Sequence, residues 1–456
     1  MQSANDQETL ARRLAGWIVE LKYEDLPDIV VQRAKQCILD QLGVQVRGAT
    51  LAQVQSVGRL VASMGGAPEA SVIQKGFKTS VAYAAYVNGT FGHSCEFDDA
   101  HFNCGHPGVC VIPAALAVAE REGASGKDLI MAVVAGYQAQ TLGVGPIHHS
   151  TLQSGWHGTK VGGVFGAAAA AAKLLRLDVE QTAHALSVAA SEASGTMEYD
   201  QSGGEVKRLH AGSASRSGVQ AALLAQLGMT GPSTIFEGKR GIFKLFGDGR
   251  APEIERFWQG RFHILDTMFK LYPAVGTVHA ALNALSEIMR EREFAPSDVE
   301  SIRVGLAAWA IPHGAAIVRP TDSISAQFSL AFSLALRIVK RRNDLDLYLD
   351  SQHWTDPEVL AVADKVSPYA MTFEPGASEL GATVVVQLHS GVTLQHYVRA
   401  PRGFPDNPAS DADLTDKFTR LVSGLISDAA VERVMATLAQ LEGEARASSL
   451  LEALAV

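Results

Sequence analysis

The chain contains 456 residues, of which 47% are hydrophobic and 19% are charged, and its formal net charge at pH 7 is −9. This composition provides enough apolar side chains for a large folded core and excludes a largely disordered chain. The mild negative charge, with one short basic run at residues 340–342, argues against a nucleic-acid partner. No apolar stretch reaches the roughly 20 residues that are needed to cross a bilayer.

Targeting and redox signals are also weak in this sequence. Residues 1–10 are polar and lack the apolar centre of a signal peptide. Four cysteines are too few for a disulfide framework in a chain of this length. We therefore expect a soluble cytoplasmic protein with free thiols and no membrane partner.

The first 200 residues show the apolar spacing of helices. Apolar residues recur every three or four positions, and Ser125 with Asp128 has the signature of a capping box. Small residues between 161 and 172 allow helix axes to approach closely, so we expect a tightly packed bundle. The predicted helices span residues 11–21, 28–42, 109–122, 126–143, 161–175 and 179–193.

The pattern changes near residue 266. Residues 299–304 alternate like a half-buried strand. Two β-rich runs, 383–389 and 392–399, meet at Ser390-Gly391, which is typical of a hairpin. The helices expected around and after these strands span residues 274–290, 325–339, 357–366 and 429–454.

These elements predict a mainly α fold with two parts. A large all-helical domain is built from both chain ends, and a smaller α+β lid domain is inserted into it. We assign residues 1–267 to the helical domain, 268–399 to the lid, and 400–456 to C-terminal helices that rejoin the helical domain. Ser410 and Asp413 are a plausible cap for the first of these helices.

The densest polar cluster lies between residues 93 and 108, between predicted apolar helices. Three carboxylates and three imidazoles fall within this segment. A helical bundle buries so many ionisable groups only when they are paired or line a cavity. We therefore predict an active-site loop, and the alternative is a solvated loop that supplies one or two helix caps.

A metal site is a second alternative for the same segment. Its imidazoles and thiols are ligand types that zinc prefers, but their spacing matches neither a CxxC pair nor an HExxH helix. We therefore expect no metal. The residues of this alternative zinc site are His93, Cys95, His101, Cys104, His106 and Cys110.

Three further patches carry polar groups that suit an anion. His157 lies just before a glycine-rich helix, whose exposed backbone N–H groups would suit a carboxylate or a phosphate, although no phosphate-loop motif is present. Lys207 and Lys270 lie in two other short polar patches. Taken singly, each lysine is better explained as a surface charge than as a site residue, and His157 is equally well explained as a core histidine. No GxSxG motif supports a serine hydrolase.

Taken in order, these patches resemble the MmgE/PrpD family. The chain is similar to the family pattern along almost its whole length, from an H-x-x-[DE]-F-D-D stretch to a closing G-x-P-x-N-P motif. The matching segments are residues 93–99, 106–108, 112–115, 136–137, 156–159, 207–212, 269–273 and 403–408.

The resemblance implies a helical domain with a smaller lid domain, a homodimer, and a pocket between body and lid that holds no metal or organic cofactor. The activities that it implies include 2-methylcitrate dehydratase, cis-aconitate decarboxylase and iminodisuccinate epimerase. The positions that match the family's active-site residues are Glu96, Ala100, His106, His157, Lys207, Lys270 and Phe332.

Three of these positions depart from the decarboxylase branch of the family. Glu96 stands where that branch has Asp, Ala100 where it has Thr, and Phe332 where it has Tyr. The last two changes remove hydroxyl groups that could hydrogen-bond to a substrate. They argue against cis-aconitate itself as the substrate.

The chemistry shared by these activities makes or consumes a carbanion beside a carboxylate. We predict that His106 transfers the proton, and that Glu96 or Asp98 orients it. Fixed cations would stabilise the developing charge, and lid closure would exclude water. The predicted substrate ligands are Lys207, Lys270, His157, His101 and His210, of which the first three are also predicted to act in catalysis.

The favoured function is a cofactor-free lyase that adds water to, or removes it from, a small di- or tricarboxylate such as a 2-methylcitrate-like acid. An epimerase or isomerase of a dicarboxylate is the alternative, because it needs the same base and the same cations. A cis-aconitate-type decarboxylase is less favoured. A non-enzymatic or metal-storage protein on the same scaffold is the remaining class.

Overall fold

The computed structural model describes residues 8–199, 204–248, 253–258, 260–374 and 377–454. The chain divides into two compact units. The first unit contains residues 1–94, 98–267 and 414–456, and the second contains 95–97 and 268–413. The sequence placed its boundaries after residues 267 and 399, whereas the units divide after 267 and 413.

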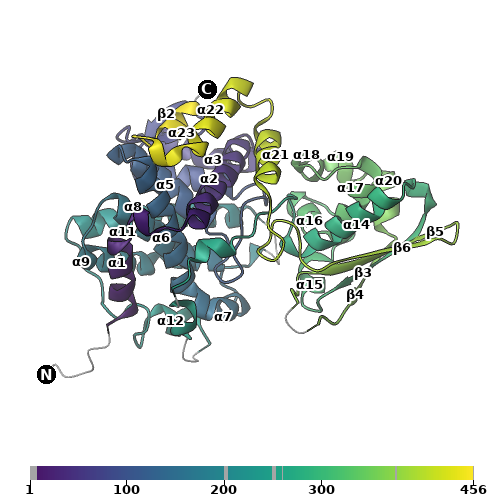
Figure 1. The fold of residues 1–456 in the computed structure, drawn as a ribbon, viewed down its shortest axis with the longest axis horizontal. Helices are drawn as coiled ribbons and strands as arrows, with labels where there is room; N and C mark the ends of the chain where they lie inside the picture. Colours follow the sequence, from purple (N-terminus) through teal and green to yellow (C-terminus); the bar gives the residue numbers. More distant parts are fainter. Residues whose placement is uncertain (1–7, 200–203, 249–252, 259, 375–376, 455–456) are drawn as a thin grey trace. The chain divides into compact units, whose positions relative to one another are not determined.

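The first unit is helical and uses both ends of the chain (Figure 1). Near the C-terminus, Lys417 forms a 2.5 Å ion pair with Asp40 of the second helix, and both side chains are buried. The helices are α1 (Leu10–Glu20), α2 (Asp28–Gly48), α3 (Gln55–Met64), α4 (Val81–Gly92), α5 (Gly108–Glu122), α6 (Gly126–Val144), α7 (His148–Gln153), α8 (Gly158–Leu174), α9 (Val179–Ala189), α11 (Val206–Gln226), α12 (Ile242–Phe246), α13 (Ile254–Trp258), α21 (Asp411–Val422), α22 (Asp428–Ala439) and α23 (Ser449–Ala453).

The centre of this unit is α8, which packs against α6 and α11. Residues 167–172 of α8 are all buried alanines. A Cβ atom on Gly218 of α11 would lie 2.4 Å from the side chain of Ala167, so the two helices approach too closely for any larger residue. The small-residue pattern in the sequence therefore has the packing consequence that was predicted.

Several predicted details are confirmed. Ser125 and Asp128 form a reciprocal capping box at the start of α6. The Ser410 hydroxyl accepts a hydrogen bond from the Asp413 backbone N–H, and the Asp413 carboxylate accepts one from the Ser410 N–H. Both caps satisfy helix N–H groups that would otherwise have no partner.

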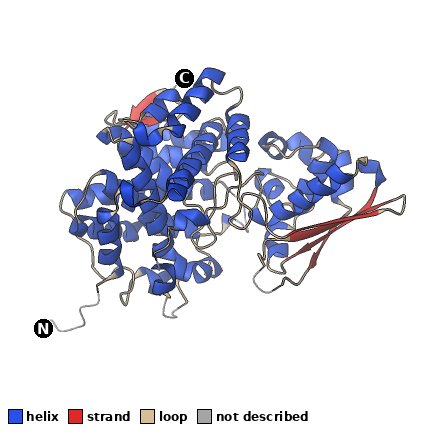
Figure 2. Cartoon of the chain, viewed as in Figure 1, coloured by secondary structure: helices blue, strands red, loops and turns tan. Residues whose placement is uncertain are grey.

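Other predictions were wrong in detail. The first unit is not entirely helical, because β1 (Ala70–Val72) and β2 (Phe77–Thr79) form a small antiparallel hairpin (Figure 2). The helix predicted over 429–454 is interrupted after Ala439. Backbone groups of Glu444 and Ala447 instead hydrogen-bond to Gly126 and Ala124 at the start of α6, so this segment cannot continue the helix.

The second unit contains a four-stranded sheet of order β4-β3-β5-β6. Strands β3 and β4 pair in parallel, whereas the pairs β3–β5 and β5–β6 are antiparallel. The strands are β3 (Val299–Leu306), β4 (Val366–Ala370), β5 (Ala382–Leu388) and β6 (Thr393–Val398). Gly391, at φ 85°, lies in the β5–β6 turn where the hairpin was predicted, whereas β4 was not predicted.

Helices cover one face of this sheet. Alternate residues of β5 are buried, and α14 packs against β5 and β6 (Figure 1). The helix predicted over 325–339 is broken at Ser329, whose hydroxyl caps the second piece by accepting from the Phe332 N–H. The helices of this unit are α14 (His279–Glu291), α15 (Ala310–Gly314), α16 (Ser323–Gln327), α17 (Leu330–Lys340), α18 (Leu345–Leu349), α19 (Ser351–Trp354) and α20 (Pro357–Ala363).

The fold is mainly α, as the sequence predicted. None of the described helices combines the length and the apolar character that crossing a membrane requires.

Candidate active site

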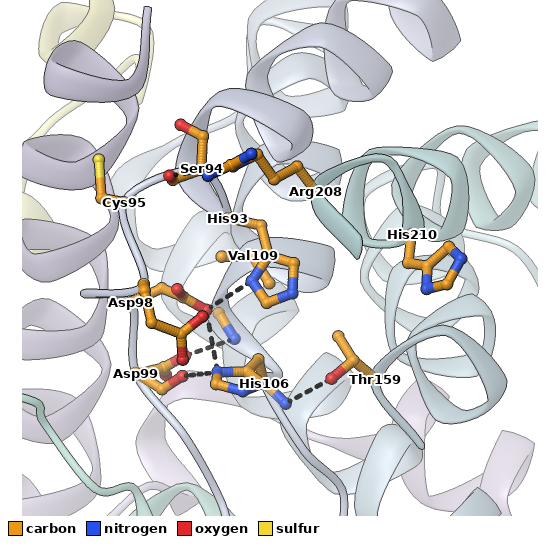
Figure 3. Close-up of polar contacts among 12 residues, drawn as sticks. His93, Ser94, Cys95, Asp98, Asp99, His106, Val109, Thr159, Arg208 and His210 are labelled. Atoms are coloured by element: carbon orange, nitrogen blue, oxygen red, sulfur yellow. Dashed lines mark hydrogen bonds and ion pairs between the residues drawn. The ribbon is translucent and has the colours of Figure 1, made fainter. Parts of the chain in front are cut away.

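The loop between α4 and α5 brings two imidazoles to one carboxylate in the first unit. Nδ1 of His93 lies 2.9 Å from Oδ2 of Asp98, and Nδ1 of His106 lies 3.0 Å from the same oxygen (Figure 3). Asp98 and His93 are fully buried, whereas the His106 side chain keeps 16% of its surface exposed. His106 is therefore the member of this group that is open to solvent.

The hydrogen bonds determine which nitrogen of His106 carries the proton. Nδ1 also lies 2.8 Å from the backbone oxygen of Asp99. Both neighbours of Nδ1 are acceptors, so Nδ1 must carry the hydrogen, and the neutral ring keeps its lone pair on Nε2. The same reasoning assigns the hydrogen of His93 to Nδ1, because that atom faces Asp98. Asp98 thus orients both rings. The sequence offered Glu96 or Asp98 for orienting His106, and the contact in the structure is with Asp98.

The charge state of this group follows from its surroundings. Burial alone would raise the pKa of Asp98, but His93 and His106 beside it hold that pKa well below its usual range. Burial lowers the pKa of His93 to about 4, against the opposing effect of Asp98. At neutral pH the carboxylate is therefore ionised and His93 is neutral.

The loop backbone at His106 is fixed by contacts to α8. The His106 N–H donates to Oγ1 of Thr159 at 3.2 Å. Gly105, at φ 77°, has no room for a side chain, since a Cβ atom there would lie 2.5 Å from the same hydroxyl. This contact joins residues 53 positions apart and holds the imidazole of His106 beside Asp98.

Asp99, adjacent to Asp98 in sequence, has a different environment. Its Oδ1 accepts the Gly108 N–H at the start of α5, at 2.9 Å, and its Oδ2 accepts the Tyr137 hydroxyl at 2.5 Å. Burial first, and then the charges of Asp40 and Asp98, raise the pKa of Asp99 to about 7. Neither Asp99 nor Tyr137 was selected from the sequence, although both lie in the matching segments.

A second set of imidazoles adjoins His93. The rings of His93 and His157 stack with centroids 5.8 Å apart, and Nδ1 of His157 lies 3.0 Å from Nδ1 of His210. The Tyr199 ring contacts both His157 and His210. One of the two facing nitrogens must donate and the other must accept, so both rings are held in defined tautomers.

Lys207 provides a cation beside these rings. It is buried in the first turn of α11, and its charge contributes to lowering the pKa of His93, His157 and His210. Burial is the larger cause in each case, and the pKa of His210 falls to about 4. The structure therefore brings His106, His157, His210, Asp98 and Lys207 into one unit, together with His93, which was not chosen as a site residue from the sequence.

His101 lies in a different group from His106. Its Nε2 is 3.9 Å from Oδ2 of Asp266, and its ring meets that of His263 edge to face. The thiols of the alternative zinc site are buried, and burial raises the pKa of Cys104 and Cys110 far above the usual range. Among the described residues, no cysteine belongs to a group with the geometry of a metal site.

Lys270 and Glu96 form an ion pair in the second unit. Nζ of Lys270 donates to Oε1 of Glu96 at 2.6 Å and to its backbone oxygen at 3.2 Å, and both residues are buried. Glu96 adopts φ 53°, which is rare for a residue other than glycine. Phe332 lies in the hydrophobic core of this unit, with its ring against Tyr348.

Comparisons with known proteins agree along the chain. The family model of the MmgE/PrpD N-terminal domain matches residues 12–255, and that of the MmgE/PrpD C-terminal domain matches residues 272–441. A cis-aconitate decarboxylase-like protein, oryM of Aspergillus oryzae, is 29% identical over 96% of this chain and 95% of its own length.

Two further relatives have similar coverage. Cis-aconitate decarboxylase of Aspergillus terreus is 28% identical over 99% of this chain and 97% of its own length. Cis-aconitate decarboxylase of Homo sapiens is 27% identical over 95% of this chain and 92% of its own length. The similarity therefore extends over both compact units.

Proposed function

The chain belongs to the MmgE/PrpD family, and we propose that it is a lyase that transfers a proton at a carbon atom beside a carboxylate of a small polycarboxylate. The single observation that carries this proposal is the orientation of His106. Its Nδ1–H is directed at Asp98 and at the Asp99 backbone oxygen, which leaves Nε2 for proton transfer.

The remaining groups suit an anionic substrate. Lys207 is a buried cation, and His157 and His210 are neutral imidazoles that can donate a hydrogen bond or accept a proton. When His106 is protonated, the charge of Asp98 stabilises the imidazolium. A proton donor and a fixed cation beside one another are what carbanion chemistry next to a carboxylate requires.

Decarboxylation of a cis-aconitate-like acid is the first reaction that we propose, because the curated relatives carry that name. The bond to the departing carboxylate breaks, and CO2 leaves. Its electron pair forms a new double bond, while the pair of the old double bond takes a proton from Nε2 of His106 at a carbon that bears another carboxylate. The imidazole then recovers a proton from solvent, so each turnover consumes one proton.

Dehydration of a hydroxy polycarboxylate is the second candidate. Ala100 and Phe332 stand where the decarboxylase branch of the family carries hydroxyl side chains, and Phe332 is enclosed in an apolar core. A substrate with its own hydroxyl group would need fewer such donors. In this reaction Nε2 of His106 removes the proton from carbon, and the electron pair of that bond forms the double bond. The hydroxyl group then leaves the neighbouring carbon as water, with a proton from the imidazolium or from solvent.

NMR in D2O distinguishes these reactions. The protein is mixed with cis-aconitate, with a citrate-like hydroxy acid and with four-carbon dicarboxylates. Loss of CO2 with deuterium at one carbon indicates a decarboxylase, loss of water a dehydratase, and exchange without loss an epimerase. His106→Ala should abolish each signal, and His389→Ala, which removes an exposed imidazole, should retain it. A His106→Ala protein with near-normal turnover contradicts the proposal.

The predicted role of Lys270 as a substrate ligand and that of Glu96 in catalysis stay predictions, as does the homodimer. We propose that the chain assembles as a homodimer, as the family resemblance implies, and light scattering on the purified protein measures this directly.

A further inference from the structure

Three side chains of the types that bind metals lie together in the first unit, separate from the His93–Asp98–His106 group. His101 comes from the loop before α5, and His263 and Asp266 come from the 3-10 turn η5 (His263–Asp266). Nε2 of His101 lies 3.9 Å, and Nδ1 of His263 lies 3.7 Å, from Oδ2 of Asp266. The three atoms lie within 4.8 Å of one another, so one small ion could contact all of them.

The tautomer of His263 directs a lone pair into this group. Its Nε2 lies 2.7 Å from the backbone oxygen of Phe257, which can only accept, so Nε2 carries the hydrogen. In that tautomer Nδ1 carries a lone pair, and it is buried without a hydrogen-bond partner among the described residues. Nδ1 is therefore the ring atom that is left to bind an ion.

His101 completes the set. Its Nε2 is also buried and has no hydrogen-bond partner in the described part of the chain. Its neighbours in this group, Nδ1 of His263 and Oδ2 of Asp266, are ligand atoms of the kinds that zinc prefers.

We propose that His101, His263 and Asp266 bind one divalent transition-metal ion, for which zinc is the best match. Two imidazoles and one carboxylate form a common protein ligand set for zinc, with water in the fourth position. The bond from His263 to a backbone carbonyl is the kind of outer contact that orients a metal-binding imidazole. The Asp266 side chain is 20% exposed, which gives the ion a path of entry.

Binding has two costs. Nδ1 of His101 now accepts the Asn103 N–H at 3.2 Å, so the His101 proton must move from Nε2 to Nδ1 and this hydrogen bond is given up. Asn103 is half-exposed, and water can replace the lost contact. Arg261 pairs with the other oxygen of Asp266, but its side chain is 61% exposed and its charge is screened by solvent.

The expected effect of the ion is structural. The His101 N–H donates to the Gly105 oxygen at 2.7 Å, and the Gly105 N–H donates back to the His101 oxygen at 3.0 Å. Gly105 directly precedes His106. An ion on His101 would therefore fix the loop that carries His106 to the η5 turn, without contacting the reacting groups.

The test uses the full chain, freed of metal with a chelator and titrated with Zn2+ by calorimetry, with Co2+ as an optical probe of coordination. We expect one equivalent to bind. In His263→Ala the dissociation constant should be at least about 100-fold larger, because losing an outer contact of a ligand already costs about 10- to 100-fold and this variant loses a ligand itself. Asp266→Asn, which preserves the shape of the side chain, should weaken binding similarly and decides the question if His263→Ala does not fold.

Two control variants identify the site. Asp98→Asn alters the other possible metal group, and His389→Ala removes an exposed imidazole. Both should bind the ion as the unaltered chain does. The proposal is overturned if no equivalent of metal binds, which is the result expected if a water molecule bridges the three groups. It is also overturned if His263→Ala and Asp266→Asn leave the metal affinity unchanged, or if Asp98→Asn alone abolishes binding. The readout is metal binding, so it stands independently of the proposed reaction.

Discussion

Replacing Asp98 by Asn should disable proton transfer while preserving the fold. The amide has the shape of the carboxylate, and its oxygen can still accept from the Nδ1–H groups of His93 and His106, at 2.9 and 3.0 Å in the native protein. What is lost is the negative charge opposite the imidazolium form of His106. A hydrogen bond between charged groups contributes about 1.5–3 kcal/mol, against about 1 kcal/mol for a neutral one.

Asp98→Asn would also leave the imidazolium without its counter-charge, which costs about 3–5 kcal/mol for a fully buried pair. Because the His106 side chain is 16% exposed, we expect the transition state to lose somewhat less, roughly 2–4 kcal/mol. Since about 1.4 kcal/mol corresponds to a tenfold change in rate, kcat should fall by about 30- to 1,000-fold. Turnover is measured by NMR on the acid identified in the substrate screen, and substrate affinity is measured separately by calorimetry. Affinity should change little, because Asp98 contacts imidazoles and does not itself attract an anion.

Asp99→Asn is the matched control. Its pKa of about 7 means that the carboxyl is already partly protonated at neutral pH, so a neutral amide is a close substitute. Its contacts are with Tyr137 and Gly108. If Asp98→Asn keeps more than a third of the native kcat, or if Asp99→Asn loses as much, then Asp98 does not act through His106.

Three further predictions follow from the same unit. Lys207→Met should weaken binding of an anionic substrate by about 10- to 100-fold, because a buried cation is lost; an unchanged affinity by calorimetry would remove Lys207 from the site. Gly105→Ala should lower the free energy of unfolding by about 2–3 kcal/mol through strain at φ 77° and the contact with Thr159. Gly123→Ala is the control, because Gly123 has φ 62° but lies in open space, and it should cost about 1 kcal/mol. Equal losses in denaturant titrations would refute the steric argument. Stability should fall by at least about 3 kcal/mol between pH 6.5 and pH 4, because buried histidines such as His93 and His148, with folded pKa values of about 4 and 3, stay neutral while the unfolded chain takes up protons. The raised pKa of Asp99 acts in the opposite direction over pH 4–7 and makes the net fall smaller than the histidines alone would give. A flat or rising stability profile between pH 6.5 and pH 4 would contradict the predicted net loss.

Periodic features of the sequence predicted the periodic parts of the fold. Helical spacing and the Ser125–Asp128 signature gave the correct elements because they depend on neighbouring residues alone. The break at Ser329 and the end of α22 at Ala439 were not predicted, because distant segments determine them. Residues 444 and 447 bond to the start of α6, about 320 positions away in the sequence.

The candidate site was predictable in composition but not in pairing. The density of ionisable groups near residue 100 indicated that they must be paired, and they are. The partners could not be assigned from spacing, because the loop depends on Gly105 meeting Thr159. The contact of His101 with Asp266 joins residues 165 positions apart, and no local pattern links them.

The contrast between Asp98 and Asp99 gives the clearest physical basis for a division of roles within this loop. Adjacent in sequence, the two carboxyl groups differ in partners: Asp98 faces two imidazole N–H groups, and Asp99 faces a phenol and one backbone N–H. Their pKa values are consequently shifted in opposite directions. Such divergent pairs are typical of sites in which one carboxylate must stay charged while its neighbour holds structure. Asp98 can therefore stabilise a proton on His106, while Asp99, which is only partly ionised at neutral pH, positions the start of α5.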